Sequence, residues 1–194
     1  WFDRAVETCP EQNFEIIWKP FQLNPEMPVS GIDRNEYLDQ KFGTRQKAIT
    51  AYKPIVEASI DHKIGINFEG IQRTPNTLDA HRLIYWARTE GIQNHIVSAL
   101  FKAYFKDSKD IGDRRILMDI AEQSGFKRKL IDRLLTSEED KKVIRDLDIR
   151  ARKSGILAVP MFIVDGTYAV SGAQNTKFWK TTFTQIKQNQ EHEI

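Results

Sequence analysis

The fold is decided by residues 155–174, which read GILAVPMFIVDGTYAVSGAQ. The apolar run from Pro160 to Val164 predicts a buried strand. Asp165-Gly166 predicts a two-residue turn with positive φ at both positions, so Thr167 to Ser171 is expected to return as the antiparallel partner. The stretch therefore predicts a β-hairpin with a proline at its entrance.

Two interpretations of that proline are open from the sequence. Pro160 lacks an N–H group, which is tolerated at the first residue of a strand, so it can simply be a trans proline that begins the strand. Only about 5–6% of X-Pro bonds in folded proteins are cis. The residues on both sides of Val159-Pro160 favour a cis bond, on the family resemblance given below.

Upstream of the hairpin, the first 33 residues predict a helix, a strand and a loop. Trp1 to Thr8 is amphipathic, and its pattern begins in the middle of a helix rather than at a cap. Phe14 to Leu23 alternates in hydrophobicity and predicts a strand, with Pro20 indicating an edge or a bulge. Asn24 to Asp33 contains two prolines and a glycine and predicts a loop.

Between this region and the hairpin, the hydrophobic period is helical and predicts about six helices. Four of them are expected over Arg45 to Ile64, Thr77 to Glu90, His95 to Phe105 and Lys127 to Leu135, the first with a bend or break at Pro54. The other two are a helix capped by Asp113 and a helix that begins at Ser137 and ends at Gly155. After the hairpin, Thr176 to Lys187 predicts a final amphipathic helix.

This order, with one strand restored before the first helix, is that of an α/β thioredoxin-like fold with a large all-helical insertion. We expect residues 1–33 and 155–194 to form the two halves of the thioredoxin fold, with 34–154 as the insertion.

Composition and charge exclude several classes of protein. The formal net charge is +2 and the basic clusters lie beside acidic residues in helical patterns, so we expect no nucleic-acid partner. No apolar run reaches the roughly 18 residues of a membrane span, so we expect no membrane partner. Cys9 is the single cysteine, which fits a reducing, cytoplasmic location. His62 and His192 show no metal-ligand spacing, and no metal site is expected.

Four stretches resemble the DsbA-like thiol-disulfide oxidoreductases, in particular their FrnE-like branch, which is related to 2-hydroxychromene-2-carboxylate isomerases and kappa-class glutathione transferases. They are PFQLNPEMP (20–28), NTLDAHRLIYWA (76–87), ALFKAYF (99–105) and the hairpin stretch itself. The resemblance implies that Val159-Pro160 is the cis-proline loop of the active site. It also implies that the backbone of Val159 contacts substrate.

One departure from the family pattern is large. Family members carry a first strand and then Cys-x-x-Cys at the start of the first helix, and the 194 residues contain neither. Cys9 lies at the wrong end of its helix to be the nucleophile. Without that strand, buried backbone groups would lack partners at about 1–3 kcal/mol each, so we expect the natural protein to extend upstream of Trp1.

Other site residues are expected around this loop. The resemblance implies that Asn76 and His81 contact substrate, although spacing alone favours His81 as a core histidine. Ser171, Gly172 and Ala173, followed by Gln174, precede a helix N-terminus whose N–H groups could hold a carboxylate of glutathione. A plain hairpin exit with a helix cap is equally open. No other cofactor is expected.

The predicted function is dithiol-disulfide exchange on protein or small-molecule substrates, as an oxidoreductase or isomerase. Two alternatives stay open: a redox-inactive binding module that holds peptides or glutathione, and a glutathione-dependent isomerase or transferase with serine in place of the nucleophilic cysteine. A homodimer is also kept open.

Overall fold

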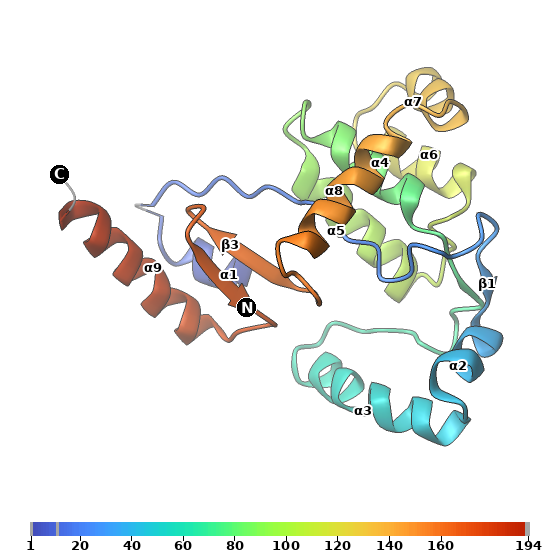
Figure 1. Cartoon of the computed structure of the whole chain (residues 1–194), viewed down its shortest axis with the longest axis horizontal. Helices are drawn as coiled ribbons and strands as arrows, with labels where there is room; N and C mark the ends of the chain where they lie inside the picture. Colours follow the sequence, from blue (N-terminus) through green and yellow to red (C-terminus); the bar gives the residue numbers. More distant parts are fainter. Residues whose placement is uncertain (1, 11, 193–194) are drawn as a thin grey trace. The chain divides into compact units, whose positions relative to one another are not determined.

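The structure is a computed structural model that describes residues 2–10 and 12–192 (Figure 1). The described residues form two compact units, which divide after Ile16 and after Arg150. We call residues 17–150 the helical unit and the described residues on either side of it the hairpin unit. Among the described residues, no helix is both long and apolar enough to span a bilayer.

The hairpin unit consists of α1 (Phe2–Glu7), β3 (Met161–Val164), β4 (Tyr168–Ser171), α9 (Thr176–His192) and the C-terminal end of α8. The hairpin forms as predicted: β3 and β4 pair antiparallel with Phe162 opposite Val170, and Asp165 and Gly166 both have positive φ. α9 begins at the predicted residue and extends beyond the predicted end.

The core of the hairpin unit is built from aromatic rings. Trp179 on α9 is fully buried, and its ring centroid lies 4.9 Å from that of Phe2 on α1 and 4.7 Å from that of Phe162 on β3. Phe183, one turn further along α9, contacts Phe14 with the ring centroids 4.6 Å apart and the rings tilted by 46°. Because side chains alternate along a strand, the same face of the hairpin buries Phe162, while Ile163 points outward and is exposed.

The helical unit contains two short strands, a π-helix and most of the helices (Figure 1). In chain order these are β1 (Ile32–Asp33), α2 (Arg34–Phe42), α3 (Arg45–Asp61), β2 (Arg73–Thr74), α4 (Leu78–Ala87), α5 (Gln93–Phe101), the π-helix η1 (Lys102–Lys106), α6 (Arg114–Gln123), α7 (Arg128–Thr136) and α8 (Lys141–Lys153). The core of α4–α7 is aliphatic, with Leu83, Ile96, Leu117 and Ile131 fully buried.

The predicted strand over Phe14 to Leu23 is wrong. Among the described residues this segment pairs with no neighbouring strand. Side chains form hydrogen bonds with its backbone instead. Gln93 accepts from the Trp18 N–H at 3.0 Å and donates to the Trp18 carbonyl at 3.2 Å. Asp148 accepts from the N–H of Gln22 at 2.7 Å. The segment is extended but held by side chains.

Two further features, at Ile32–Asp33 and at Pro54, differ from the sequence predictions. Ile32–Asp33, expected in a loop, pairs with Arg73–Thr74 as β1 and β2. Gly31 allows this approach, since its φ is 64° and a Cβ there would lie 2.6 Å from the Thr74 carbonyl oxygen. α3 runs through Pro54 as one helix instead of breaking. The compact units divide at 16/17 and 150/151, because residues 17–22 are bonded to the helices. The division of the thioredoxin fold and its insertion at 33/34 and 154/155 stays a prediction.

Arg82 on α4 is a fully buried cation that fixes the chain between α7 and α8. Its guanidinium donates to the carbonyl oxygens of Leu134, Ser137 and Glu139 at 2.6–3.0 Å, and to Asp79 at 2.7 Å. The planar fork of arginine can satisfy several acceptors at once, which a lysine cannot do.

Candidate functional site

The hairpin entrance, at Val159, has backbone groups that pair with no other described residue. The Val159-Pro160 peptide bond is cis, and Val159 is 45% exposed. The β3–β4 pairing begins only at Met161, and within the described part of the chain the backbone of Val159 makes no hydrogen bond. The N–H and C=O of Val159 can therefore pair with an extended peptide.

The exit of the hairpin lies beside its entrance. Gly172 donates its N–H to the carbonyl oxygen of Pro160 at 2.9 Å, so the Ser171–Ala173 exit lies close to the loop. Gly172 has a φ of 78°, a conformation that glycine adopts without strain. The side chain of Gln174 donates back to the Ser171 carbonyl at 2.9 Å.

The start of α9 already has a cap from its own chain. Asn175 accepts from the N–H of Phe178 at 2.9 Å, which satisfies one of the free donors at this helix end. This geometry is that of the hairpin exit with a helix cap, one of the two interpretations left open by the sequence. A glutathione carboxylate at the same place stays a prediction.

Asn76 and His81 belong to the helical unit, whereas Val159 and the Ser171–Ala173 exit belong to the hairpin unit. Both ends of the Asn76 side chain are engaged: the amide donates to the Met27 carbonyl at 2.7 Å and accepts from the Leu78 N–H at 2.9 Å. Asn76 thus ties the loop at Met27 to the start of α4. Its contact with substrate stays a prediction.

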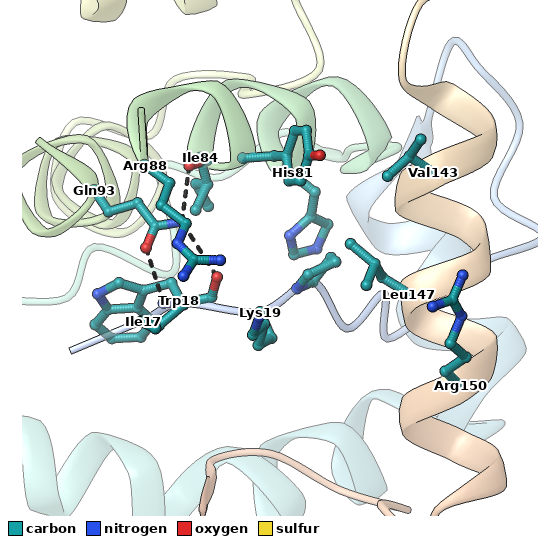
Figure 2. A pocket seen from close by; sticks show the side chains of 12 residues that line it. Ile17, Trp18, Lys19, His81, Ile84, Arg88, Gln93, Val143, Leu147 and Arg150 are labelled. Atoms are coloured by element: carbon teal, nitrogen blue, oxygen red, sulfur yellow. Dashed lines mark hydrogen bonds between the residues drawn. The ribbon is translucent and has the colours of Figure 1, made fainter. Parts of the chain in front are cut away.

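His81 lies at a pocket of about 220 Å³ within the helical unit (Figure 2). Burial lowers the pKa of His81 from 6.5 to about 4, while the charge of Asp148 and a hydrogen bond to the Phe21 backbone act in the opposite direction. His81 is therefore neutral at pH 7.

The other walls of this pocket come from three parts of the helical unit: residues 17–20, α4 with the start of α5, and α8. Figure 2 shows Trp18 and Arg88 on one side and Leu147 and Arg150 on the other. Sequence reasoning missed these residues because they are far apart in the chain. A usable signal was the aromatic Trp18 beside Lys19 in a segment that also carries Pro20.

Cys9 follows α1, is partly buried, and packs against the aromatic core of the hairpin unit. Its N–H donates to the Val6 carbonyl at 3.1 Å, at the C-terminal end of the helix. Among the described residues, no three His, Cys, Asp or Glu side chains come together as a metal site.

Comparison with known proteins identifies the family to which this chain is similar. The model of the DSBA-like thioredoxin domain matches residues 2–183. YwbO, an uncharacterized protein of Bacillus subtilis, is 26% identical over 182 residues, covering 92% of this chain and 84% of that protein. The crystal structure of the probable DsbA oxidoreductase SCO1869 from Streptomyces coelicolor superimposes with a TM-score of 0.83 at 22% identity, over 95% of this chain and 80% of that one.

The family match runs from α1 through the helical unit and the hairpin into α9, so it includes every element at which a site residue was predicted. The structural likeness agrees with a thioredoxin fold that carries a helical insertion. The chain therefore belongs to the DsbA-like thioredoxin-domain family.

Proposed function

We propose that the protein is a thiol-disulfide oxidoreductase of the DsbA type, which exchanges disulfides with protein or small-molecule substrates. The observation that carries the proposal is the family match over residues 2–183. The exposed, unpaired backbone of Val159 at the hairpin entrance supports it, because an extended substrate segment can align there.

In the proposed reaction, a thiolate attacks one sulfur of the substrate disulfide, and the other substrate sulfur leaves as a thiolate. A second cysteine then attacks the mixed disulfide, so the enzyme pair is oxidised and the substrate is reduced. The reverse sequence oxidises a substrate. The role of Val159 is to hold the substrate backbone in register while these exchanges occur.

The proposal needs two cysteines besides Cys9, since Cys9 is the single cysteine in the 194 residues and lies at the C-terminal end of α1. A cysteine pair at the N-terminal end of a helix meets this requirement, because the positive end of the helix dipole lowers a thiol pKa there.

The first test is a count of thiols in the natural protein, by alkylation and intact mass before and after reduction. Two additional thiols after reduction, together with reduction of insulin disulfides, are the expected result. A single thiol that reduction leaves unchanged would overturn the proposal and favour the binding module.

A second test addresses the hairpin entrance. Val159→Pro removes the backbone N–H and should lower kcat/KM for a disulfide peptide by about tenfold, because one substrate hydrogen bond is lost. Val159→Thr keeps the backbone donor and should retain activity. Equal activity of the two variants would exclude backbone recognition at Val159.

A further inference from the structure

The pocket at His81 carries a positive charge that the described part of the chain leaves unbalanced. Lys19, Arg88 and Arg150 line it, and none of the three has a carboxylate within ion-pair distance among the described residues. Of the residues that the structure describes, no acidic side chain lines the pocket. By contrast, Arg82 and Arg114 each contact an aspartate at 2.6–2.7 Å.

Two aspartates of α8 lie near enough to affect this charge, and Asp148 acts directly on the pocket residue His81. Asp146 lies in the field of Arg150 but is ion-paired with Lys142 at 2.6 Å. Asp148 is buried and accepts the Gln22 N–H at 2.7 Å. Three cations therefore line the pocket against the nearby carboxylate of Asp148, so the net charge around the pocket is positive.

The interior of the same pocket is mainly apolar. Trp18, Tyr85 and Leu147 form much of its wall, and His81 adds no charge at neutral pH because burial lowers its pKa to about 4. Arg88 and Arg150 are exposed, so their charges lie toward solvent rather than at the base. An apolar interior under a cationic rim is complementary to an amphiphilic anion.

We propose that this pocket binds a small organic carboxylate, with its apolar part against Trp18 and Leu147 and its acid group in the positive field of Arg88, Arg150 and Lys19. Guanidinium groups suit this role because they bind a carboxylate through two parallel hydrogen bonds. The volume of about 220 Å³ equals about seven water molecules of liquid volume, which suits an acid of about six carbons.

This inference does not depend on the proposed redox reaction. Binding to the pocket needs no cysteine, and a protein that fails every disulfide assay could still bind the acid. Conversely, an active oxidoreductase without affinity for the acid would leave the redox proposal intact and overturn this one.

The experiment is a titration of the whole protein with hexanoate, followed by calorimetry and by the NMR signal of the Trp18 indole N–H. Small ligands bind more tightly per atom than drug-sized ones, so we expect a Kd of about 1 mM for this eight-heavy-atom ligand. Hexanamide lacks the charge, acetate lacks the apolar chain, and inorganic phosphate tests for simple anion binding. We expect each to bind at least about tenfold more weakly than hexanoate.

Variants separate the charged rim from the apolar wall. Arg88→Gln and Arg150→Gln should each weaken hexanoate about tenfold and leave hexanamide unchanged. Arg145→Gln is the matched control, because Arg145 is an exposed arginine of α8 that does not line the pocket. Leu147→Asn should weaken hexanoate and hexanamide alike.

Three results would overturn the proposal. The first is no movement of the Trp18 signal at a hexanoate concentration about twentyfold above the expected Kd. The second is equal affinity for hexanoate and hexanamide. The third is a loss of affinity in Arg145→Gln as large as in Arg150→Gln, which would indicate general charge attraction instead of a site.

Discussion

The two units of the chain stabilise their backbones in different ways. In the hairpin unit, β3 and β4 satisfy each other, and the core is a cluster of aromatic rings around Trp179. In the helical unit, buried polar side chains complete the backbone hydrogen bonding. Arg82 donates to carbonyl oxygens of the α7–α8 connection, and Gln93 and Asp148 form hydrogen bonds with the backbone of residues 17–22.

This difference is visible in the buried residues themselves. All six buried polar or charged side chains of the described chain lie in the helical unit, namely Gln22, Ser59, Thr74, Arg82, Gln93 and Asp148. An irregular segment packed among helices has no neighbouring strand to pair with its backbone. A buried carbonyl left without a hydrogen bond lowers the free energy of unfolding by about 1–3 kcal/mol. Replacing a buried polar residue should therefore lower the stability of the helical unit most. Replacing a core aromatic residue should lower the stability of the hairpin unit most.

The largest effect is expected at Arg82. Arg82→Ala leaves three carbonyl oxygens and Asp79 without their donor and opens a cavity, so unfolding free energy should fall by about 5 kcal/mol. Arg82→Lys keeps the charge but cannot reach all the acceptors, and should lose about 3 kcal/mol. Urea unfolding followed by circular dichroism measures both.

Arg133 provides the control for that experiment. It is an exposed arginine of α7, and Arg133→Ala should change stability by less than about 0.5 kcal/mol. A loss below about 2 kcal/mol for Arg82→Ala would mean that water replaces the guanidinium at the α7–α8 connection. The contrast between the two units would then be much weaker than proposed.

A somewhat smaller effect is expected at Trp179 in the hairpin unit. Trp179→Ala removes the ring that Phe2 and Phe162 contact and should cost about 4 kcal/mol. Phe178, its exposed neighbour on α9, is the matched control, and Phe178→Ala should cost less than about 1 kcal/mol.

Hydrogen exchange of the Trp179→Ala variant sharpens the comparison. If the units are stabilised separately, amides of β3 and β4 lose protection while those of α4–α7 keep it. Equal loss of protection in both units would show that they unfold as one cooperative body. The separate description of their cores would then have no energetic counterpart.

The hairpin and most helices could be predicted from the sequence because their signals are local. Asp165-Gly166 selects the turn, Pro160 to Val164 supplies the strand, and the helices carry a clear 3.6-residue period. Phe14 to Leu23 has the pattern of a strand, but pattern does not say what pairs with it. Gln93, which lies about 75 positions away in the chain, forms the hydrogen bond with the Trp18 backbone that a paired strand would form.

The candidate site divides in the same way. Val159, Pro160 and the Ser171–Ala173 exit were found from one continuous stretch. The pocket at His81 was not, since Trp18, Arg88 and Arg150 come together only through tertiary packing. Exposed arginines also resemble ordinary surface charge in a sequence, and only the geometry distinguishes those that lack a carboxylate partner.

The smallest of the three effects is a pH dependence that arises at His81. The folded protein takes up the His81 proton near pH 4, whereas the unfolded chain takes it up near 6.5. This contribution to stability is fully present above pH 6.5 and is lost as the pH falls to about 4, by about 3 kcal/mol in total.

Carboxylates titrate in the same range, so the useful quantity is the difference in unfolding free energy between the wild-type protein and His81→Gln. We expect that difference to shrink steadily from pH 7 to pH 4 in urea unfolding curves, while exposed His95→Gln follows the wild-type profile. Parallel profiles for His81→Gln and the wild type would place the acid sensitivity elsewhere, and Asp148, which shares the buried surroundings of His81, would be the next residue to replace.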